Sequence, residues 1–446
     1  MNILVIGNGF DLAHGLPTKY TDFLFFCKVI NCIIKDNEIE RKIVKIDKYN
    51  TIWIDPSEEL SFKKIKSIED FVYNVSPLNS NANERDKKVY NEIINNFIRE
   101  YLLGEGRDQK LVKDIICLIF NNFWINYFLQ CNMHGNENWI DFESEISNVV
   151  KCIDKKMRDE KCNLYDSAKL QRGHYMEQLF MEKYGSVSYK GIRDKLEGDL
   201  NKLIRAFEIY LTEYVEKIEI QEKSLDINDL EIDFILSFNY THIFSKLYDV
   251  SSQSKQEIAD DSFDYIHGQV DAKNSIESNN MVLGIDEYLG KKRRNKDIEF
   301  VKFKKYYQRV YKGTGSKYEE WINVIREENN IYMERKHDCE IYIRNIDVLT
   351  NIKEEKIAEL KQLNENPPSH NVYIFGHSLD ITDKDILREL ILNDNVYTTI
   401  YYPDKEELGR KIANLIKVIG QDELIRRTGG NTKTIEFKQQ QDMVNI

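Results

Sequence analysis

The chain has 446 residues, a length that suits two to three domains of about 150 residues, or one large domain with an insertion. Its 63 basic and 75 acidic residues give a net charge of −12, which excludes a polycationic nucleic-acid-binding protein. Only 20 glycines and 6 prolines are present, and no proline lies between residues 78 and 366. Long helices are therefore expected over most of the chain.

The seven cysteines are odd in number and form no C-x-x-C pair, which argues against a disulfide framework and a cysteine zinc site. The N-terminus runs straight into an apolar segment and shows no signal-peptide pattern. No stretch reaches the roughly 18 uninterrupted apolar residues of a membrane-spanning helix. We therefore expect a cytoplasmic protein with no metal and no membrane partner.

Short apolar runs bounded by Gly, Asn, Asp or His predict buried strands. In chain order they are Ile3–Ile6, Phe234–Phe238, Tyr265–His267, Met281–Ile285, Val372–Phe375 and Val396–Tyr401. Helical patterns follow the last two runs, at Asp383–Asn393 and Lys405–Ile419. This alternation predicts an α/β fold with a parallel, Rossmann-like sheet that helices cover.

More than 200 residues between the first two predicted strands have mainly helical patterns. One apolar stripe keeps to a single helix face: Ile192, Leu196, Leu200, Leu203, Phe207, Tyr210 and Tyr214. A second comprises Val89, Ile93, Phe97 and Tyr101. The predicted organisation is a nucleotide-binding core of residues 1–27, 228–286 and 367–420, a helical insertion of residues 28–227, a second insertion of residues 287–366 with a basic patch, and a polar C-terminal tail of residues 421–446.

The first predicted strand ends in the turn Gly7-Asn8-Gly9-Phe10-Asp11. Glycines at this place let the backbone approach a pyrophosphate, and a helix N-terminus after them favours its negative charge. The full G-x-G-x-x-G spacing is missing, so the alternative is an ordinary strand-to-helix turn with Asp11 as its cap. Asp11 is poorly placed beside a phosphate and could instead accept a hydrogen bond from a ribose hydroxyl.

Three more motifs follow predicted strands, where ligands of open α/β sheets bind. Asn239 offers an amide that can hold a sugar hydroxyl or a water, unless it only bonds its own backbone. His267 is suited to general-base work, although a lone histidine is more often structural. Gly376 permits a close backbone approach, and Ser378 with the amides after it can bind phosphate or ribose.

Other carboxylates are assigned to structure rather than to chemistry. The run Thr382-Asp383-Lys384-Asp385 resembles a capping box, which makes Thr382 and Asp385 helix-starting residues. Asp141 and Glu145 share one helix face, where solvation accounts for them. Glu143 is kept as a candidate for covering the site.

Taken in order, these motifs resemble the nicotinamide dinucleotide site of the sirtuin family. The family's G-A-G-x-S-x-x-x-G-I-P is similar to Gly7-Asn8-Gly9 with Gly15-Leu16-Pro17, its T-Q-N-I-D to Ser237–Thr241, its H-G to His267-Gly268, and its G-T-S to Gly376-His377-Ser378. More closely, G-N-G-F-D-L-x-H-G-L-P-T, the segment Trp139–Glu143, F-N-Y-T, I-H-G and G-H-S-L resemble the bacterial abortive infection AbiH family.

This resemblance implies a sirtuin-like core without the zinc module, because the deacylases carry four zinc cysteines after the H-G motif and only Cys339 follows His267 here. Tyr20 replaces the arginine expected after the G-I-P match, and Thr241 replaces an acidic residue. The resemblance implies NAD as substrate or ligand, with Asn239 and His267 as catalytic residues. The implied nucleotide-binding residues are Gly7, Asn8, Gly9, Phe10, Asp11, Pro17, Thr18, Thr241, Gly376, His377 and Ser378.

We therefore expect an antiphage abortive-infection protein that hydrolyses NAD at the nicotinamide glycosidic bond, with Asn239 orienting the ribose hydroxyl or the attacking water and His267 as general base. A non-catalytic sensor of NAD or ADP-ribose is one alternative. A phage-derived trigger is expected, and a homo-oligomer is left open.

A nucleic-acid-acting defence effector is the other alternative. It depends on residues Gly290–Lys317, where eleven basic residues stand against two acidic ones and aromatic residues interleave. The favoured interpretation of this run is a solvated face or a contact with the acidic remainder of an oligomer.

Overall fold

The computed structural model describes residues 1–36, 39–46, 51–54, 88, 92–93, 108–134, 141–157, 189–248, 262–290, 292–294, 296–345, 350–430 and 433–446. The chain divides into two compact units, each made of separate segments. Unit 1 comprises Met1–Gly15, Ile220–Gly268 and Gly313–Ile446, and unit 2 comprises Leu16–Glu219 and Gln269–Lys312. Residues 287–366, predicted as one insertion, are therefore shared between the units, and the first core segment ends at Gly15 rather than at residue 27.

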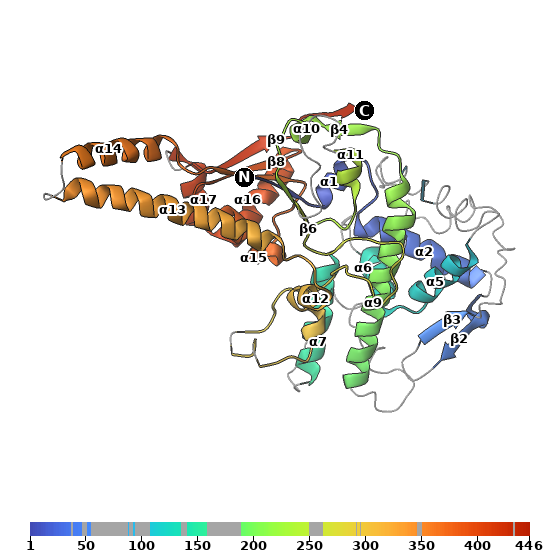
Figure 1. Cartoon of the computed structure of the whole chain (residues 1–446). Helices are drawn as coiled ribbons and strands as arrows, with labels where there is room; N and C mark the ends of the chain where they lie inside the picture. Colours follow the sequence, from blue (N-terminus) through green and yellow to red (C-terminus); the bar gives the residue numbers. More distant parts are fainter. Residues whose placement is uncertain are drawn as a thin grey trace. The chain divides into compact units, whose positions relative to one another are not determined.

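Unit 1 is built on a six-stranded sheet (Figure 1) with the strand order β6-β5-β1-β7-β8-β9. The strands are β1 (Asn2–Ile6), β5 (Phe234–Ser237), β6 (Phe263–Tyr265), β7 (His370–Phe375), β8 (Val396–Tyr402) and β9 (Ile435–Gln439). Every pairing in this sheet is parallel. The chain adds strands on one side of β1 and then on the other, which is the order of doubly wound nucleotide-binding folds and confirms the predicted Rossmann-like sheet.

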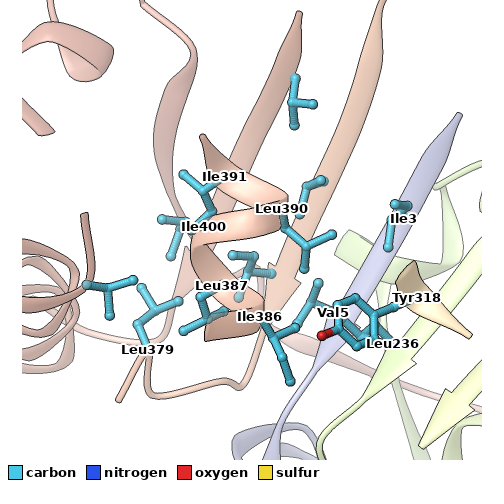
Figure 2. Packing of buried hydrophobic residues seen from close by; sticks show 14 of the residues in the cluster. Ile3, Val5, Leu236, Tyr318, Leu379, Ile386, Leu387, Leu390, Ile391 and Ile400 are labelled. Carbon is cyan, nitrogen blue, oxygen red and sulfur yellow. The ribbon is translucent and has the colours of Figure 1, made fainter. Parts of the chain in front are cut away.

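Helices and a small second sheet complete unit 1. The helices are α1 (Asn8–Ala13), α10 (Leu225–Asn228), α11 (Ile243–Leu247), α13 (Tyr318–Arg344), α14 (Thr350–Glu365), η7 (Ile381–Asp383), α15 (Lys384–Ile391), α16 (Lys405–Ile419) and α17 (Gln421–Thr428), and β4 (Glu222–Ser224) pairs antiparallel with β10 (Met443–Asn445). The core joins Ile3 and Val5 of β1 to Ile386 and Leu390 of α15 (Figure 2), all of them at most 1% exposed. Burial of such apolar area is the main term that stabilises the fold.

The C-terminal residues 421–446 differ from the loosely packed polar tail that their composition predicts. They form α17, β9 and β10, and β9 pairs with β8 at the edge of the large sheet. Ile435 is the one fully buried residue of β9, whose other side chains are partly or fully exposed. Because an edge strand is held largely by backbone hydrogen bonds, its side chains can be polar, and the composition therefore misled the prediction.

The described residues of unit 2 are mainly helical. It contains α2 (Tyr20–Asp36), η1 (Ile39–Lys42), β2 (Ile43–Ile46), β3 (Thr51–Ile54), α5 (Gln109–Ile119), α6 (Phe123–His134), α7 (Phe142–Met157), α9 (Tyr189–Glu213), η3 (Val215–Lys217), η6 (Val301–Phe303) and α12 (Lys305–Lys312). The apolar stripe of α9 is buried, and the ring of Tyr210 packs against Phe23 and Phe26 of α2. The earlier stripe and Trp139 lie largely outside the described residues.

The strand predicted at Met281–Ile285 does not form. The segment is buried and belongs to unit 2, where only Ile285 makes an isolated bridge, to Lys304. Gln308 takes the place of a neighbouring strand, because its side-chain amide bonds both Leu283 N (3.0 Å) and Leu283 O (3.1 Å). An apolar run can thus be buried as extended chain when a side chain forms hydrogen bonds with its backbone N–H and C=O groups.

Candidate functional site

Four loops of unit 1 follow the carboxyl ends of β1, β5, β6 and β7, and each of them carries residues singled out by the sequence motifs. These four strands are parallel neighbours in the sheet, so their carboxyl ends lie along one edge. The structure therefore brings together the turn at Gly7, the loop at Asn239, His267 and the loop at Gly376. Two other implied binding residues, Pro17 and Thr18, belong to unit 2.

Glycines allow the loops after β1 and β7 to meet backbone against backbone. Gly7 N–H donates to Phe375 O (3.2 Å), and Gly9 N–H donates to Gly376 O (2.8 Å). Gly376 has φ +71°, and a Cβ atom there would lie 2.1 Å from Phe10 N. The need for glycine is thus explained by chain packing, and the Gly7 and Gly9 amides already have acceptors within the protein.

Asp11 is the centre of a first buried polar group, and it is only 1% exposed. Its carboxylate accepts hydrogen bonds from Asn239 Nδ2 (3.1 Å) and Thr241 Oγ1 (2.8 Å). The alternative of a helix-capping Asp11 is wrong, because Gly7 is at the N-cap of α1 and makes no side-chain cap bond. The carboxylate instead connects α1 to the loop after β5.

The side chain of Asn239 is oriented by this contact. A carboxylate can only accept hydrogen bonds, so Nδ2 faces Asp11 and the amide oxygen Oδ1 points elsewhere. Asn239 is 4% exposed, and its Oδ1 has no hydrogen-bond partner among the described residues. Unpaired buried acceptors are rare and unfavourable, which makes this atom a candidate position for binding a ligand hydroxyl or a water.

His267, His377 and Asp383 form a second buried polar group. Asp383 Oδ1 lies 3.3 Å from His267 Nε2, and Asp383 Oδ2 lies 3.4 Å from His377 Nε2. The three residues are 6%, 4% and 8% exposed, respectively. A carboxylate between two imidazoles can accept a hydrogen bond from each and can stabilise a positive charge on either ring.

Asp383 is the functional candidate that the sequence motifs missed, because it lies inside an apparent capping box. In the structure Asp380 provides the cap, accepting from Thr382 N–H (3.0 Å) at the start of η7. Asp383 occupies the N-cap position of α15 but makes no side-chain cap bond. The one signal in the sequence was Asp380, a capping residue just upstream, because its presence makes a capping role for Asp383 unnecessary.

The loop after β7 holds the His377 ring in one tautomer. Leu379 N–H donates to His377 Nδ1 (2.9 Å), which places the ring hydrogen on Nε2. Leu379 has φ +58°, an unusual conformation for a residue with a side chain. Side chains of α16 hold the same loop, since Lys411 donates to His377 O and Asn414 donates to Ser378 O. Burial lowers the pKa of Lys411 to about 8.

Consecutive residues of the β5 loop reach both polar groups. The ring of Phe238 packs edge-on against His267 (5.5 Å between ring centroids) and against His377 (4.2 Å). The next side chain, that of Asn239, is the one held by Asp11. This loop therefore supplies Phe238, which packs against both histidines, and Asn239, whose amide can orient a ligand.

His14 connects α1 to the β4 strand through hydrogen bonds. Its Nδ1 lies 2.7 Å from Phe10 O, so Nδ1 carries the hydrogen, and its Nε2 lies 2.9 Å from the Tyr248 hydroxyl. The Tyr248 hydroxyl oxygen accepts from Ser224 N–H (2.7 Å), which leaves its own hydrogen to donate to His14. This arrangement needs a neutral imidazole, and burial lowers the pKa of His14.

We expect His14 to make unit 1 less stable in mild acid. In the unfolded chain His14 takes up a proton near its ordinary pKa of about 6.5, whereas in the folded chain it takes up the proton only at lower pH. The full free energy of unfolding is therefore present above that pH and decreases below it. One proton corresponds to a slope of at most about 1.4 kcal/mol per pH unit. Urea unfolding between pH 8 and pH 5.5 should therefore show a shallower pH dependence for His14→Gln. Equal slopes for both proteins would contradict the assignment.

At least five of the eleven basic residues in the run Gly290–Lys317 pair with acidic residues of unit 2. Lys304 and Lys305 are only 1% and 5% exposed, so they are not surface charges. The favoured interpretation, a solvated face or an oligomer contact, is thus corrected for these residues. The ion pairs within unit 2 are Arg293 with Asp154 and Asp297, Arg294 with Glu287, Lys302 with Glu197, Lys304 with Glu287, and Lys305 with Glu143.

The carboxylates of α7 also have structural partners in unit 2. Glu143, a candidate for covering the site, pairs with buried Lys305 at 2.9 Å. Asp141 accepts from Glu143 N–H (2.9 Å), as a helix cap does. Glu145 is 9% exposed and accepts from the Tyr127 hydroxyl (2.8 Å), so the expected solvation of this pair is wrong for Glu145.

The described part of the chain has neither a group of metal-binding side chains nor a membrane-spanning helix. It contains no group of three or more His, Cys, Asp or Glu side chains placed to hold a metal ion. In the same residues, no helix combines the length and the apolar character needed to cross a membrane.

Comparison with known proteins gives one match. The family model described as bacteriophage abortive infection AbiH matches residues 3–402, a range that includes all four strand-end loops. Neither the curated proteins nor the solved structures contain a match.

Proposed function

Because the chain belongs to the bacteriophage abortive infection AbiH family, its role lies in abortive infection, and we propose that it acts by hydrolysing NAD at the nicotinamide glycosidic bond. The proposed site is formed by the loops after β1, β5, β6 and β7. The observation that carries the proposal is the buried amide oxygen of Asn239, which has no hydrogen-bond partner among the described residues. The similarity of the strand-end motifs to the sirtuin nicotinamide dinucleotide site also supports it.

In the proposed reaction, a water molecule attacks C1′ of the nicotinamide ribose. The bond from C1′ to the nicotinamide nitrogen breaks and its electron pair goes to that nitrogen, while the water loses a proton. The products are nicotinamide, ADP-ribose and one proton. Positive charge develops on the ribose as the bond breaks, so the site has to orient the sugar and admit one nucleophile.

Two side chains perform these tasks in our proposal. Asn239 Oδ1 accepts a hydrogen bond from a ribose hydroxyl or from the attacking water, and Asp11 keeps the amide in that orientation. His267 takes the proton of the water as general base. Proton transfer by a positioned base contributes about 10²- to 10⁴-fold to a rate.

The remainder of the dinucleotide would lie along the same strand ends, where open α/β sheets bind their ligands. The Gly7 and Gly9 amides bond Phe375 O and Gly376 O, so they are not offered to a pyrophosphate in this conformation. Asn8 and Ser378 are exposed at the ends of β1 and β7. We propose that these two residues contact the pyrophosphate.

The experiment incubates purified protein with NAD, with and without extract of phage-infected cells as a source of the trigger, and follows released nicotinamide. We expect Asn239→Ala and His267→Ala to lower kcat by about 10²- to 10⁴-fold. His242→Ala is the matched control, because His242 lies in the same β5 loop, is only partly buried and makes no side-chain cap bond to α11.

Two results would contradict the proposal. One is the absence of nicotinamide release by the wild-type protein under both conditions. The other is full activity in both the Asn239 and the His267 variants. Saturable NAD binding without release would instead identify a nucleotide sensor.

A further inference from the structure

We infer that Asp383 is a positioning residue that selects which ring nitrogen of His267 acts as the base, and that His377 holds Asp383 for this task. The observation behind the inference is the pair of contacts from the two oxygens of Asp383 to the two histidines, at 3.3 Å and 3.4 Å. The expected fall in kcat rests on the proposed function, whereas the expected tautomer of His267 can be observed without turnover.

His377 has a tautomer that is decided by the backbone of its own loop. Its Nδ1 accepts the Leu379 N–H, so a proton on Nδ1 would have to displace that hydrogen bond. With Nδ1 as the acceptor, the ring hydrogen is on Nε2, which lies 3.4 Å from Asp383 Oδ2. In our proposal Asp383 accepts this hydrogen as the ionised carboxylate, which has no hydrogen of its own to donate.

The second oxygen of Asp383 then decides the state of His267. Asp383 Oδ1 can only accept, so His267 Nε2 carries the hydrogen and Nδ1 carries the lone pair. His267 Nδ1 is accordingly the atom that takes the proton from water. When the imidazolium forms, the negative charge of Asp383 stabilises it, as the buried aspartate does in other His–Asp pairs.

The surroundings keep this geometry in place. Phe238 packs edge-on against both imidazoles, which limits rotation of the rings and makes the local medium less polar. The left-handed conformation of Leu379 is unfavourable by itself and persists only when neighbours hold it. Lys411 and Asn414 of α16 provide that support, because they bond the two carbonyl groups just before Leu379.

The test replaces Asp383 by asparagine, which keeps the size of the side chain and removes its charge. We expect kcat to fall about 10²- to 10⁴-fold, as it does when the aspartate that orients a catalytic histidine is neutralised, with less than about threefold change in KM. Asp380→Asn is the matched control. Asp380 lies three residues earlier, its cap bond to Thr382 N–H survives the change, and we expect wild-type kinetics.

A second readout does not require turnover. In protein labelled with ¹⁵N-histidine, the eight histidines can be distinguished by comparing spectra of His267→Ala and His377→Ala. Wild-type protein should show both rings with the hydrogen on Nε2, and Asp383→Asn should shift His267 toward a mixture of tautomers while His377 keeps its Leu379 bond.

Each outcome decides the inference. A wild-type His267 with its hydrogen on Nδ1, or ¹⁵N shifts of His267 that do not change in Asp383→Asn, would overturn it. Should Asp383→Asn fail to fold, the wild-type tautomers and Asp383→Glu decide, because a retained charge should preserve the Nε2–H tautomer. If wild-type protein releases no nicotinamide but shows the expected tautomers, the proposed function fails and the positioning of His267 by Asp383 stands.

Discussion

Replacing Gly376 by alanine is expected to lower the free energy of unfolding of unit 1 by about 3 kcal/mol or more. Gly376 has φ +71°, and an added Cβ would lie 2.1 Å from Phe10 N and 2.5 Å from Gly9 C. The left-handed conformation alone costs about 1–2 kcal/mol for a residue with a side chain. The remaining loss comes from forcing apart two loops whose backbones touch. Urea unfolding measures the change, and the release of nicotinamide should be lost with it.

Gly430→Ala separates the cost of the left-handed backbone conformation from the cost of the steric clash between the two loops. Gly430 also has a positive φ (+64°), but a Cβ there would meet nothing within 4 Å. We expect its free energy of unfolding to fall only by the cost of the left-handed conformation, about 1–2 kcal/mol. Equal losses in the two variants would show that the contact between the loops after β1 and β7 contributes nothing to stability.

Replacing Glu208 by alanine is expected to lower the free energy of unfolding of unit 2 strongly. Glu208 is fully buried, and its carboxylate accepts from Arg205, from Asp271 N–H (3.0 Å), and from the side chains of Asn274 (2.6 Å) and Asn279. Its removal leaves the Arg205 guanidinium with two backbone carbonyl contacts but no counter-charge from this carboxylate, and it takes the acceptor from three other donors. Loss of one partner of a buried ion pair costs about 3–5 kcal/mol, and we expect a decrease of that size in the free energy of unfolding.

The control for this variant lies on the same helix. Glu197 pairs with Lys302 at 2.7 Å, but Lys302 is 54% exposed. Exposed ion pairs contribute about 0–1 kcal/mol, so Glu197→Ala should remain close to the wild type in the same urea titration. A loss in Glu208→Ala no larger than that in Glu197→Ala would contradict the assigned role of the buried carboxylate.

Much of the fold was predictable because the signals for its central elements are local. β1, β5, β7 and β8 are buried apolar runs that end at turn residues, and α15 and α16 repeat apolar residues at helical spacing. The exceptions have identifiable causes. Met281–Ile285 has the composition of a strand, but Gln308 replaces the strand partner. β9 lacks the apolar composition of a buried strand, because an edge strand requires little side-chain burial.

The candidate site was predictable in part. The motifs identify Asn239, His267, Gly376 and His377, because a functional loop after a buried strand can be recognised from its own residues. The partner of Asn239 could not be derived in this way, since Asp11 lies 228 residues earlier in the chain. Asp383 received no role from the sequence, because it lies between Thr382 and Asp385, which the pattern assigned to a capping box.

The amino-acid sequence by itself determined the class of fold, the strand ends that carry polar residues, and the membership in the family. These properties depend on residue spacing over a few turns or strands, and that spacing is present in the unfolded chain. The tertiary structure alone decided that the Gly7 and Gly9 amides bond the protein itself, that Asn239 Oδ1 lacks a partner among the described residues, and that Asp383 faces two histidines. Hydrogen-bond partners and ring tautomers depend on which distant groups meet, and only the packed sheet brings those groups within bonding distance.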